Sequence, residues 1–187
     1  MLIHWFRRDL RLRDNTALLA AAAQSGGAVI PVFIFDDAII RGRFASPART
    51  QFLLDSLAAL DAELRGLGLH LVLRRGEPLP ILLDLLRTTG AQGVTWNRDY
   101  TPYAVKRDTA IKRELRAAGY RAESYKDAVV FEMNEVATAD GRPYTIYTPY
   151  AKRWRARLES EPVAVQGIPA LAAIPLPASE RLPALNE

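Results

Sequence analysis

The sequence predicts an α/β fold, with a five-stranded parallel, doubly wound, Rossmann-like sheet followed by an irregular tail. Short apolar runs alternate with helical stretches five times within residues 1–131. This alternation is typical of parallel strands joined by right-handed crossovers. The run at 28–35 is apolar on both faces, as expected for a strand that helices cover on both sides. The length of 187 residues suits one domain of this class.

The first strand is expected at Leu2–Phe6, a run of bulky apolar residues. A helix follows over 16–24, which is rich in Ala and Leu. Asp14 or Asn15 can cap it, because a short side-chain oxygen accepts from the free backbone N–H groups of the first turn. The glycine pair at 26–27 then ends the helix.

The second strand is expected at 28–35 and contains Pro31. Because proline cannot donate a ladder hydrogen bond, it predicts a bulge or a strand start near Val32. A long helix begins after Ser46, with Ser as the cap and Pro47 in the first turn. Leucines at steps of four and three predict one core-facing stripe on it: Leu53, Leu57, Leu60, Leu64 and Leu67.

Three more strands and two more helices complete the predicted domain. The strands are expected at 70–73, Gly93–Asn97 and 121–124, with a short extension at 129–131. The helices are expected at Pro78–Thr89 and 102–118, each closed by the glycine that follows it.

The last third of the chain has a different composition. Residues 132–160 hold a turn signal at 140–141, a tyrosine cluster and a basic run, and we interpret them as a connecting segment. Residues 161–187 hold five of the twelve prolines and show neither helical nor strand periodicity. They are interpreted as an interdomain linker that lies on the domain or leads to another one.

Composition excludes several kinds of site. The absence of Cys removes disulfides, thiolate nucleophiles and Cys-built metal centres, and it fits a cytoplasmic location. With only His4 and His70, neither a His-rich metal site nor a His-based triad is expected. The net charge of +4 permits contact with phosphates without requiring it. No apolar stretch approaches the roughly 18 residues of a membrane-spanning helix, and the N-terminus does not resemble a signal peptide.

Polar and aromatic residues follow three of the predicted strands, at 7–15, 36–37 and 98–103. Ligands of open parallel sheets bind beyond the carboxyl ends of the strands, where the strand order reverses, so these three segments are expected to converge at one edge. Their guanidinium groups, carboxylates and rings suit a flat polar heterocycle. Two alternatives remain open. The charges of 7–14 can pair across the loop, and Asp36 and Asp37 can cap the next turn.

The usual phosphate-binding and nucleophile motifs are missing. No Gly-x-Gly-x-x-Gly follows the first strand, and no Gly-x-x-x-x-Gly-Lys-Ser/Thr occurs anywhere. No Gly-x-Ser-x-Gly elbow occurs either. Ordinary dinucleotide binding, P-loop NTP hydrolysis and serine-hydrolase chemistry are therefore not supported.

A basic run at 152–157 surrounds Trp154. One interpretation is nucleic-acid binding, because basic groups neutralise phosphates and an aromatic ring can stack on a base. The interpretation that we favour is a solvated helical face with Trp154 packed inward. Trp5 and Trp96 are interpreted as core residues in preference to site residues. The same interpretation applies to the two histidines.

The stretch at 5–15 (WFRRDLRLRDN) resembles the opening motif of DNA photolyases and cryptochromes. Further stretches match the same family in order: Pro47-Ala48-Arg49, 96–103 (WNRDYTPY) with Arg107-Asp108, and 143–150 (PYTIYTPY) with Trp154. Four ordered motifs over about residues 1–160 make the resemblance specific, and it identifies the α/β part as similar to the N-terminal domain of that family.

The resemblance implies a light-harvesting antenna domain of a DNA photolyase (deoxyribodipyrimidine photo-lyase) or cryptochrome. In the family this domain holds a chromophore that passes excitation to FAD in a larger helical domain, where an excited reduced flavin splits a pyrimidine dimer in DNA. The chain ends where that helical domain would begin. We therefore expect no catalytic residue and no metal-binding residue in this chain. The parent protein resembles a lyase, but the chain alone is not expected to repair DNA.

The resemblance also implies a pocket lined by Asp36, Arg49, Asp99 and Tyr103. Folate-binding members carry Asn-Glu where this chain has Tyr103-Ala104, and the motif form at 96–103 is similar to members that use a deazaflavin. The expected chromophore is therefore 8-hydroxy-5-deazaflavin, followed by FMN and then by an empty pocket. Folate stays a possible chromophore, although the broken Asn-Glu pattern counts against it.

The implied partners are the helical FAD domain, against which 144–154 would lie, and the chromophore. Weak or no DNA binding is expected of this chain alone, and no membrane contact. The alternative function is a non-photochemical nucleotide- or flavin-binding module of similar fold, against which the missing Gly-rich loops count. Whether the parent is a repair enzyme or a photoreceptor is not encoded in these residues.

Overall fold

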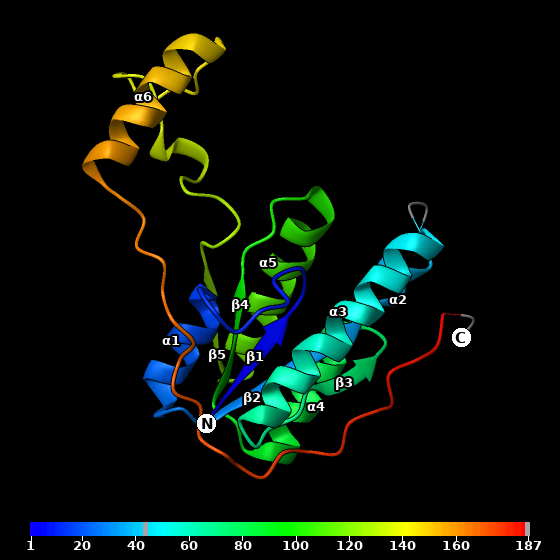
Figure 1. The fold of residues 1–187 in the computed structure, drawn as a ribbon. Helices are drawn as coiled ribbons and strands as arrows, with labels where there is room; N and C mark the ends of the chain where they lie inside the picture. The colour runs from blue at the N-terminus through cyan, green and yellow to red at the C-terminus, as the bar shows by residue number, and fades with distance from the viewer. Residues whose placement is uncertain (43–44, 186–187) are drawn as a thin grey trace.

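The computed structural model describes residues 1–42 and 45–185. Within them, five strands form one parallel sheet in the order β3-β2-β1-β4-β5 (Figure 1). The strands are β1 Leu2–Phe6, β2 Val29–Phe35, β3 Val72–Arg75, β4 Gly93–Asn97 and β5 Arg121–Tyr125. The strand order reverses between β1 and β4, so the predicted doubly wound parallel sheet is confirmed.

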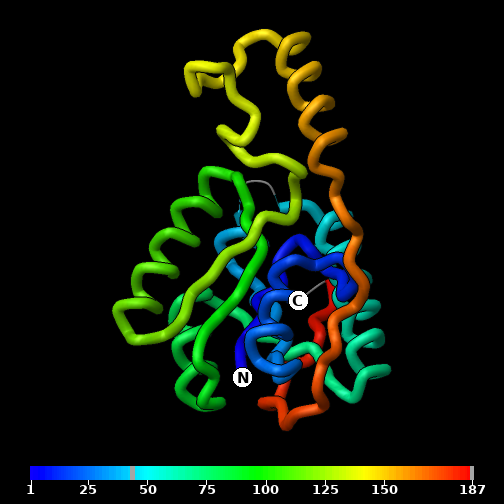
Figure 2. The backbone as a smooth tube through the Cα atoms, turned by 90° about the vertical axis from the view of Figure 1, so that its left-hand side faces the viewer, coloured from blue at the N-terminus to red at the C-terminus, as the bar shows by residue number. Residues whose placement is uncertain are grey.

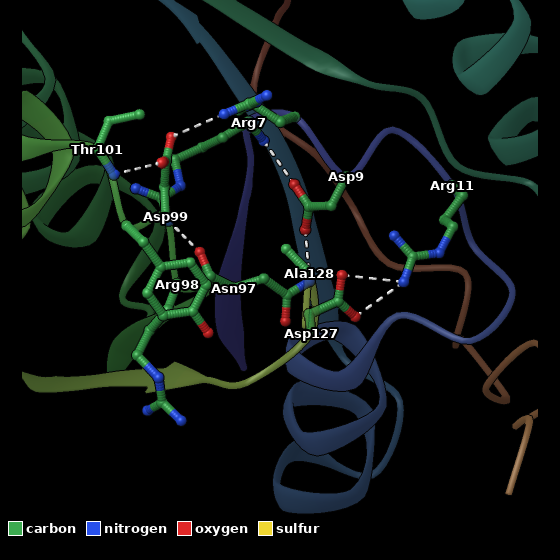
Figure 3. A pocket seen from close by; sticks show the side chains of 11 residues that line it. Arg7, Asp9, Arg11, Asn97, Arg98, Asp99, Thr101, Asp127 and Ala128 are labelled. Atoms are coloured by element: carbon green, nitrogen blue, oxygen red, sulfur yellow. Dashed lines mark hydrogen bonds and ion pairs between the residues drawn. The ribbon is translucent and has the colours of Figure 1, made fainter. Parts of the chain in front are cut away.

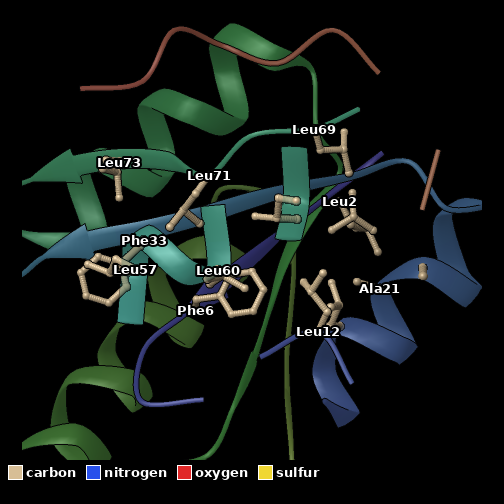
Figure 4. Close-up of a cluster of buried hydrophobic side chains, with 14 of the residues drawn as sticks. Leu2, Phe6, Leu12, Ala21, Phe33, Leu57, Leu60, Leu69, Leu71 and Leu73 are labelled. Carbon is tan, nitrogen blue, oxygen red and sulfur yellow. The ribbon is translucent and has the colours of Figure 1, made fainter. Parts of the chain in front are cut away.

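Two pairs of helices cover the two faces of the sheet. One pair is α1 Thr16–Ser25 and α3 Pro47–Gly66, and the other is α4 Pro78–Thr89 and α5 Pro102–Ala117. Side chains of α1 and α3 belong to one hydrophobic cluster (Figure 4), and those of α4 and α5 belong to a second. The three inner strands β1, β2 and β4 are therefore buried on both faces, which explains why they are mainly apolar, whereas the edge strands β3 and β5 carry charged residues.

β1 shows how the sheet divides the core. Leu2 and Phe6 pack in the cluster beneath α1 and α3, whereas Ile3 and Trp5 pack in the cluster beneath α4 and α5. Successive side chains of a strand point to opposite faces, so one short strand supplies both clusters. At the end of β1 this alternation leaves Trp5 on the face of α5, where the candidate site lies.

His4 is buried among these apolar neighbours. Its Nδ1 lies 3.2 Å from the Thr95 hydroxyl, and its ring meets Phe6 edge-on at 4.3 Å. Burial lowers the pKa of His4 to about 4, because desolvation disfavours the charged ring. The ring is therefore neutral at physiological pH, in agreement with its interpretation as a packed residue.

The expected bulge or late strand start at Pro31 is wrong. β2 runs unbroken through Pro31, which lies opposite His4 of β1. On the other side, β3 pairs with β2 only from Val32 onward, where Val32 faces Val72. The missing N–H of Pro31 therefore costs nothing on the β3 side, because no strand lies opposite it there.

Two further expectations need correction. Leu57, Leu60 and Leu64 are buried as predicted, but Leu54 completes the stripe, while Leu53 is only partly buried and Leu67 lies beyond the helix and is exposed. The predicted strand extension at 129–131 does not form. The chain leaves the sheet after β5, and Phe131 packs instead against the ring of Trp154 at 5.7 Å.

A segment beyond the sheet projects from the α/β body and ends in α6 Tyr147–Ser160 (Figure 2). Trp154 packs against Phe131, and Arg157 stacks over the same ring at 4.7 Å. Lys152, Arg153 and Arg155 are exposed. The favoured interpretation of a solvated basic face with Trp154 packed inward is therefore confirmed.

The tail from 161 to 185 lies on the domain in an extended conformation and runs back past α1 towards β3 (Figures 1 and 2). The N–H of Leu73 donates to the hydroxyl of Ser179 at 2.8 Å, and the N–H of Glu180 donates to the carbonyl of Leu73 at 3.2 Å. These bonds occupy the outer edge of β3, the edge strand of the sheet. Residues 186–187 of the predicted linker lie outside the described residues.

The tail also closes the core. Ile174 and Leu176 pack against both hydrophobic clusters. The N–H of Ala172 donates to the carbonyl of Gly27 at 3.0 Å. At Gly27, φ is +84° and an added Cβ would lie 2.8 Å from the carbonyl oxygen of Ala170. Only glycine allows this close approach of the two backbones.

No helix within 1–42 and 45–185 has the length and apolar character needed to cross a membrane.

Candidate functional site

The three loops that follow β1, β2 and β4 meet at one edge of the sheet, as predicted. Arg7, just after β1, donates to the backbone carbonyl of Asn97 at the end of β4. Asp36, just after β2, accepts a hydrogen bond of 2.8 Å from the hydroxyl of Tyr103 on α5. Two adjoining cavities open at this edge, one mainly apolar and one polar.

The larger cavity, called here the apolar pocket, has a volume of about 800 Å³. Its floor is formed by Trp5 and the end of β2, and its walls come from the turn α2 Asp37–Ile40, the first turns of α3 and the start of α5. The volume and the mainly apolar lining are typical of small-molecule sites. All four residues that the resemblance implied line this pocket: Asp36, Arg49, Asp99 and Tyr103.

The carboxylate of Asp36 is buried and accepts hydrogen bonds from three donors. One carboxylate oxygen accepts from the N–H of Ala38 at 3.1 Å, so Asp36 caps α2 as the capping alternative proposed. The other oxygen accepts from Tyr103 and from the guanidinium of Arg107 at 3.2 Å. Partial burial and the Asp36 carboxylate raise the pKa of Tyr103, so its hydroxyl stays protonated and donates.

Arg107 was not recognised from the sequence as a pocket residue. Its guanidinium stacks over the rings of Trp5, at 4.8 Å, and Tyr103, at 5.4 Å, and it pairs with Asp108 at 3.0 Å. The spacing from Tyr103 to Arg107 is one helical turn, which places both on the same face of α5. That spacing is the signal that could have identified Arg107.

Asp99 and Arg49 enter the pocket from different elements. One carboxylate oxygen of Asp99 accepts from the N–H of Thr101 at 3.0 Å, and the other lies 3.8 Å from Arg8. Partial burial alone would raise the pKa of Asp99, but the hydrogen bonds from Thr101 and the nearby Arg8 outweigh it and hold the pKa below its usual range. Arg49 lies in the first turn of α3.

The second cavity, called here the polar cavity, has a volume of about 570 Å³ (Figure 3). Arg7 pairs with Asp108 at 2.6 Å, and Arg11 pairs with Asp127 at 2.8 Å. Asp9 accepts from the backbone N–H of Arg7 at 2.9 Å. The arginines of the first loop therefore pair with carboxylates of other elements, whereas Asp9 binds a backbone N–H within the loop. Among the described residues, the alternative in which charges of 7–14 pair with one another across the loop is not what forms.

The side-chain amide of Asn97 ties this loop to α1. It donates to the amide oxygen of Asn15 at 2.8 Å and accepts from the backbone N–H of Ala17 at 2.9 Å. Asn15 also caps α1 by accepting from the N–H of Leu18 at 3.1 Å. These buried amides hold the first loop, the end of β4 and the start of α1 in one arrangement beside the polar cavity, which Asn97 lines.

A family model for DNA photolyase matches residues 2–172 of the chain. The chain belongs to the DNA photolyase family. Among curated relatives, the deoxyribodipyrimidine photo-lyase of Halobacterium salinarum is 38% identical over 178 residues, covering 91% of this chain and 36% of that protein. The deoxyribodipyrimidine photo-lyase of Agrobacterium fabrum is 44% identical over 157 residues, covering 82% of this chain and 31% of that protein. The chain thus spans about a third of the length of these photolyases.

Two solved photolyase structures have the same fold. A class III photolyase from Agrobacterium tumefaciens superposes with a TM-score of 0.83 at 41% identity, covering 97% of this chain and 37% of that chain. An archaeal photolyase from Sulfolobus tokodaii superposes with a TM-score of 0.74 at 28% identity, covering 94% of this chain and 38% of that chain. The latter contains two FAD molecules, with the implication of a novel light-harvesting cofactor in that protein.

Proposed function

We propose that this domain is the light-harvesting part of a DNA photolyase or cryptochrome and holds an antenna chromophore in the apolar pocket. The observation that carries the proposal is the pocket itself. It is a mainly apolar cavity of about 800 Å³ at the carboxyl edge of the sheet, with a few charged groups at its rim. The bound chromophore would absorb light and pass its excitation to FAD in a helical domain beyond this chain.

The residues present fit a flat aromatic ring system. Trp5, Phe33 and Phe35 offer apolar surface to such a ring. The Nε1–H of Trp5 is buried and has no hydrogen-bond partner among the described residues. Asp36 and Arg107 supply an acceptor and a donor for the polar edge of the ring.

Among chromophores, we propose 8-hydroxy-5-deazaflavin first and FMN second. Tyr103 occupies the first position of the folate-binding pattern, and its hydroxyl is bound to Asp36. Ala104 occupies the second position, is buried and carries no polar side-chain atom. Neither residue supplies a carboxylate or amide to a folate, whereas the tricyclic pigments need an apolar floor and polar edge groups.

The projecting segment is proposed to contact the helical domain. The side chain of Tyr147 is 75% exposed, and Ile146 and Tyr150 are also exposed. Tyrosines bury large areas on contact at low entropic cost. For the chain alone we propose weak or no DNA binding, since Trp154 is packed against Phe131 and is not free to stack on a base. A cytoplasmic location accords with the cysteine-free sequence.

The proposal is tested by titrating the 187-residue chain with 8-hydroxy-5-deazaflavin, FMN and a reduced folate while the absorption spectrum is recorded. We expect a shifted and saturable band with 8-hydroxy-5-deazaflavin. Leu53→Trp, which fills the apolar pocket, is expected to weaken binding by about tenfold or more. Ala59→Trp on the exposed face of the same helix is the matched control and should bind normally. No response to any pigment would contradict the antenna function.

A further inference from the structure

Two guanidinium groups lie over the ring of Trp5. The guanidinium carbon of Arg107 is 4.8 Å from the ring centroid, and that of Arg7 is 5.1 Å from it. Trp5 is only 1% exposed and both arginine side chains are buried, so little water screens these charges. Asp108 pairs with both arginines and holds them in place. Two fixed positive charges therefore act on one buried ring.

Arg107 also acts on a second ring of the apolar pocket. Among the described residues that line this pocket, only Trp5 and Tyr103 have side chains that readily give up an electron. Arg107 lies over the ring of Tyr103 at 5.4 Å, and it donates to the same carboxylate oxygen of Asp36 that accepts from the Tyr103 hydroxyl. A tyrosine that loses an electron also releases its proton, and here the accepting oxygen faces a guanidinium group. One arginine is therefore in contact with both electron-donating rings of the pocket.

A guanidinium group over an aromatic ring makes the ring harder to oxidise. A neutral ring attracts the guanidinium group through its electron-rich face. Once the ring has lost an electron it carries a positive charge, and two positive charges in a poorly solvated site repel each other strongly. The Asp108 carboxylate offsets part of the arginine charge, but the guanidinium groups are what lie over the ring of Trp5. The arrangement therefore raises the potential at which Trp5 gives up an electron.

This property matters when the ring beside Trp5 has absorbed light. An electronically excited ring is a much stronger oxidant than the same ring in its ground state. It can take one electron from Trp5, which leaves a chromophore radical anion and a Trp5 radical cation, and the excitation is then lost. The ring of Trp96 lies 6.1 Å from that of Trp5 and could refill it, which would make the loss lasting. A light-harvesting pocket with an unprotected tryptophan would therefore waste its excitation.

We propose that Arg107, assisted by Arg7, prevents Trp5 and Tyr103 from reducing the excited chromophore, so that the pocket preserves the excitation of the ring that it binds. The inference rests on the proposed function and adds a photochemical role for residues of the same pocket. The suppressed step is balanced, because the one electron that would leave an aromatic side chain is the one that would enter the excited chromophore.

The fluorescence lifetime of 8-hydroxy-5-deazaflavin bound at saturation to the 187-residue chain tests this inference. Arg107→Met removes the charge and is expected to shorten the lifetime by about threefold or more. Arg107→Lys keeps the charge and should retain most of the lifetime. Arg113→Met is the matched control, because Arg113 lies on the same helix, is 74% exposed and lines neither cavity. It should leave the lifetime as it is in the natural sequence.

Removal of the electron donors assigns the effect. In the Arg107→Met chain, the further changes Trp5→Phe and Tyr103→Phe should together restore the long lifetime. With Arg107 in place, Trp5→Phe should change the lifetime by less than about twofold, because Trp5 is already protected. This arm keeps the test decisive if Arg107→Met does not fold. A much longer lifetime in Trp5→Phe alone would show that Trp5 quenches the chromophore despite the arginines, and would overturn the inference.

Voltammetry of the chain without chromophore tests the cause. When Trp96→Phe and Trp154→Phe leave Trp5 as the one tryptophan, Arg107→Met should move its oxidation wave to lower potential, and Arg113→Met should not. An unchanged wave would overturn the inference. A bound chromophore whose lifetime does not depend on Arg107 would also overturn it, although the antenna function would stand. Failure of the chromophore to bind would refute the antenna function and the protective role together.

Discussion

Replacing Asp108 by Ala is expected to lower the free energy of unfolding by about 3–5 kcal/mol. Asp108 accepts from Arg7 at 2.6 Å and from Arg107 at 3.0 Å, and these two side chains are only 8% and 11% exposed. Burial lowers the pKa of Arg7, and the neighbouring Asp108 is the largest influence that opposes this. Without Asp108, two guanidinium groups would stay buried with too little negative charge beside them.

Urea denaturation of Asp108→Ala measures this effect, and Glu114→Ala on the same helix is the control. Glu114 pairs with Arg113 at 2.7 Å, but these side chains are 43% and 74% exposed, so the loss of Glu114 should cost less than about 1 kcal/mol. Equal costs for the two variants would contradict the expectation that burial of Arg7 and Arg107 makes the loss of Asp108 costly.

Ending the chain after Glu161 is expected to destabilise the domain by about 4 kcal/mol or more and to cause self-association. Four partly buried apolar side chains of the tail pack on the core: Leu171, Ile174, Leu176 and Leu182. Each contributes roughly 1 kcal/mol or more through burial of apolar surface. Truncation would also expose the edge of β3, and unpaired strand edges promote association between molecules.

Urea denaturation and gel filtration of the shortened chain test this expectation. In the full chain, Ile174→Ser should be clearly destabilising, whereas Val165→Ser should be nearly neutral because Val165 is exposed. A shortened chain that remains monomeric and equally stable would show that the tail is a passive linker.

The sheet could be predicted from the sequence because its inner strands β1, β2 and β4 are buried on both faces and are therefore mainly apolar. The helices between them carry proline or cap residues at their starts and glycines after their ends, so their bounds were also accessible. The Pro31 prediction failed because it depends on where β3 begins, and pairing between strands is not encoded locally. The packing of the tail depends on contacts with α1 and β3 that its own residues do not reveal.

The site was predictable only in part. The positions of Asp36, Arg49, Asp99 and Tyr103 around one pocket came from a family resemblance, and the structure brings all four together. Arg107 was missed because an arginine in a charged helix is usually solvated. Its position over the ring of Trp5 becomes visible only in the structure.

The central claim is that an aromatic ring binds beside Trp5, and the indole N–H signals of the three tryptophans test it most directly. In a ¹H–¹⁵N correlation spectrum of the 187-residue chain, saturating 8-hydroxy-5-deazaflavin should shift the Trp5 signal most, since Trp5 lines the apolar pocket. Trp154, on the projecting segment, should keep its position. A ligand that shifts Trp154 and leaves Trp5 unchanged would contradict the account.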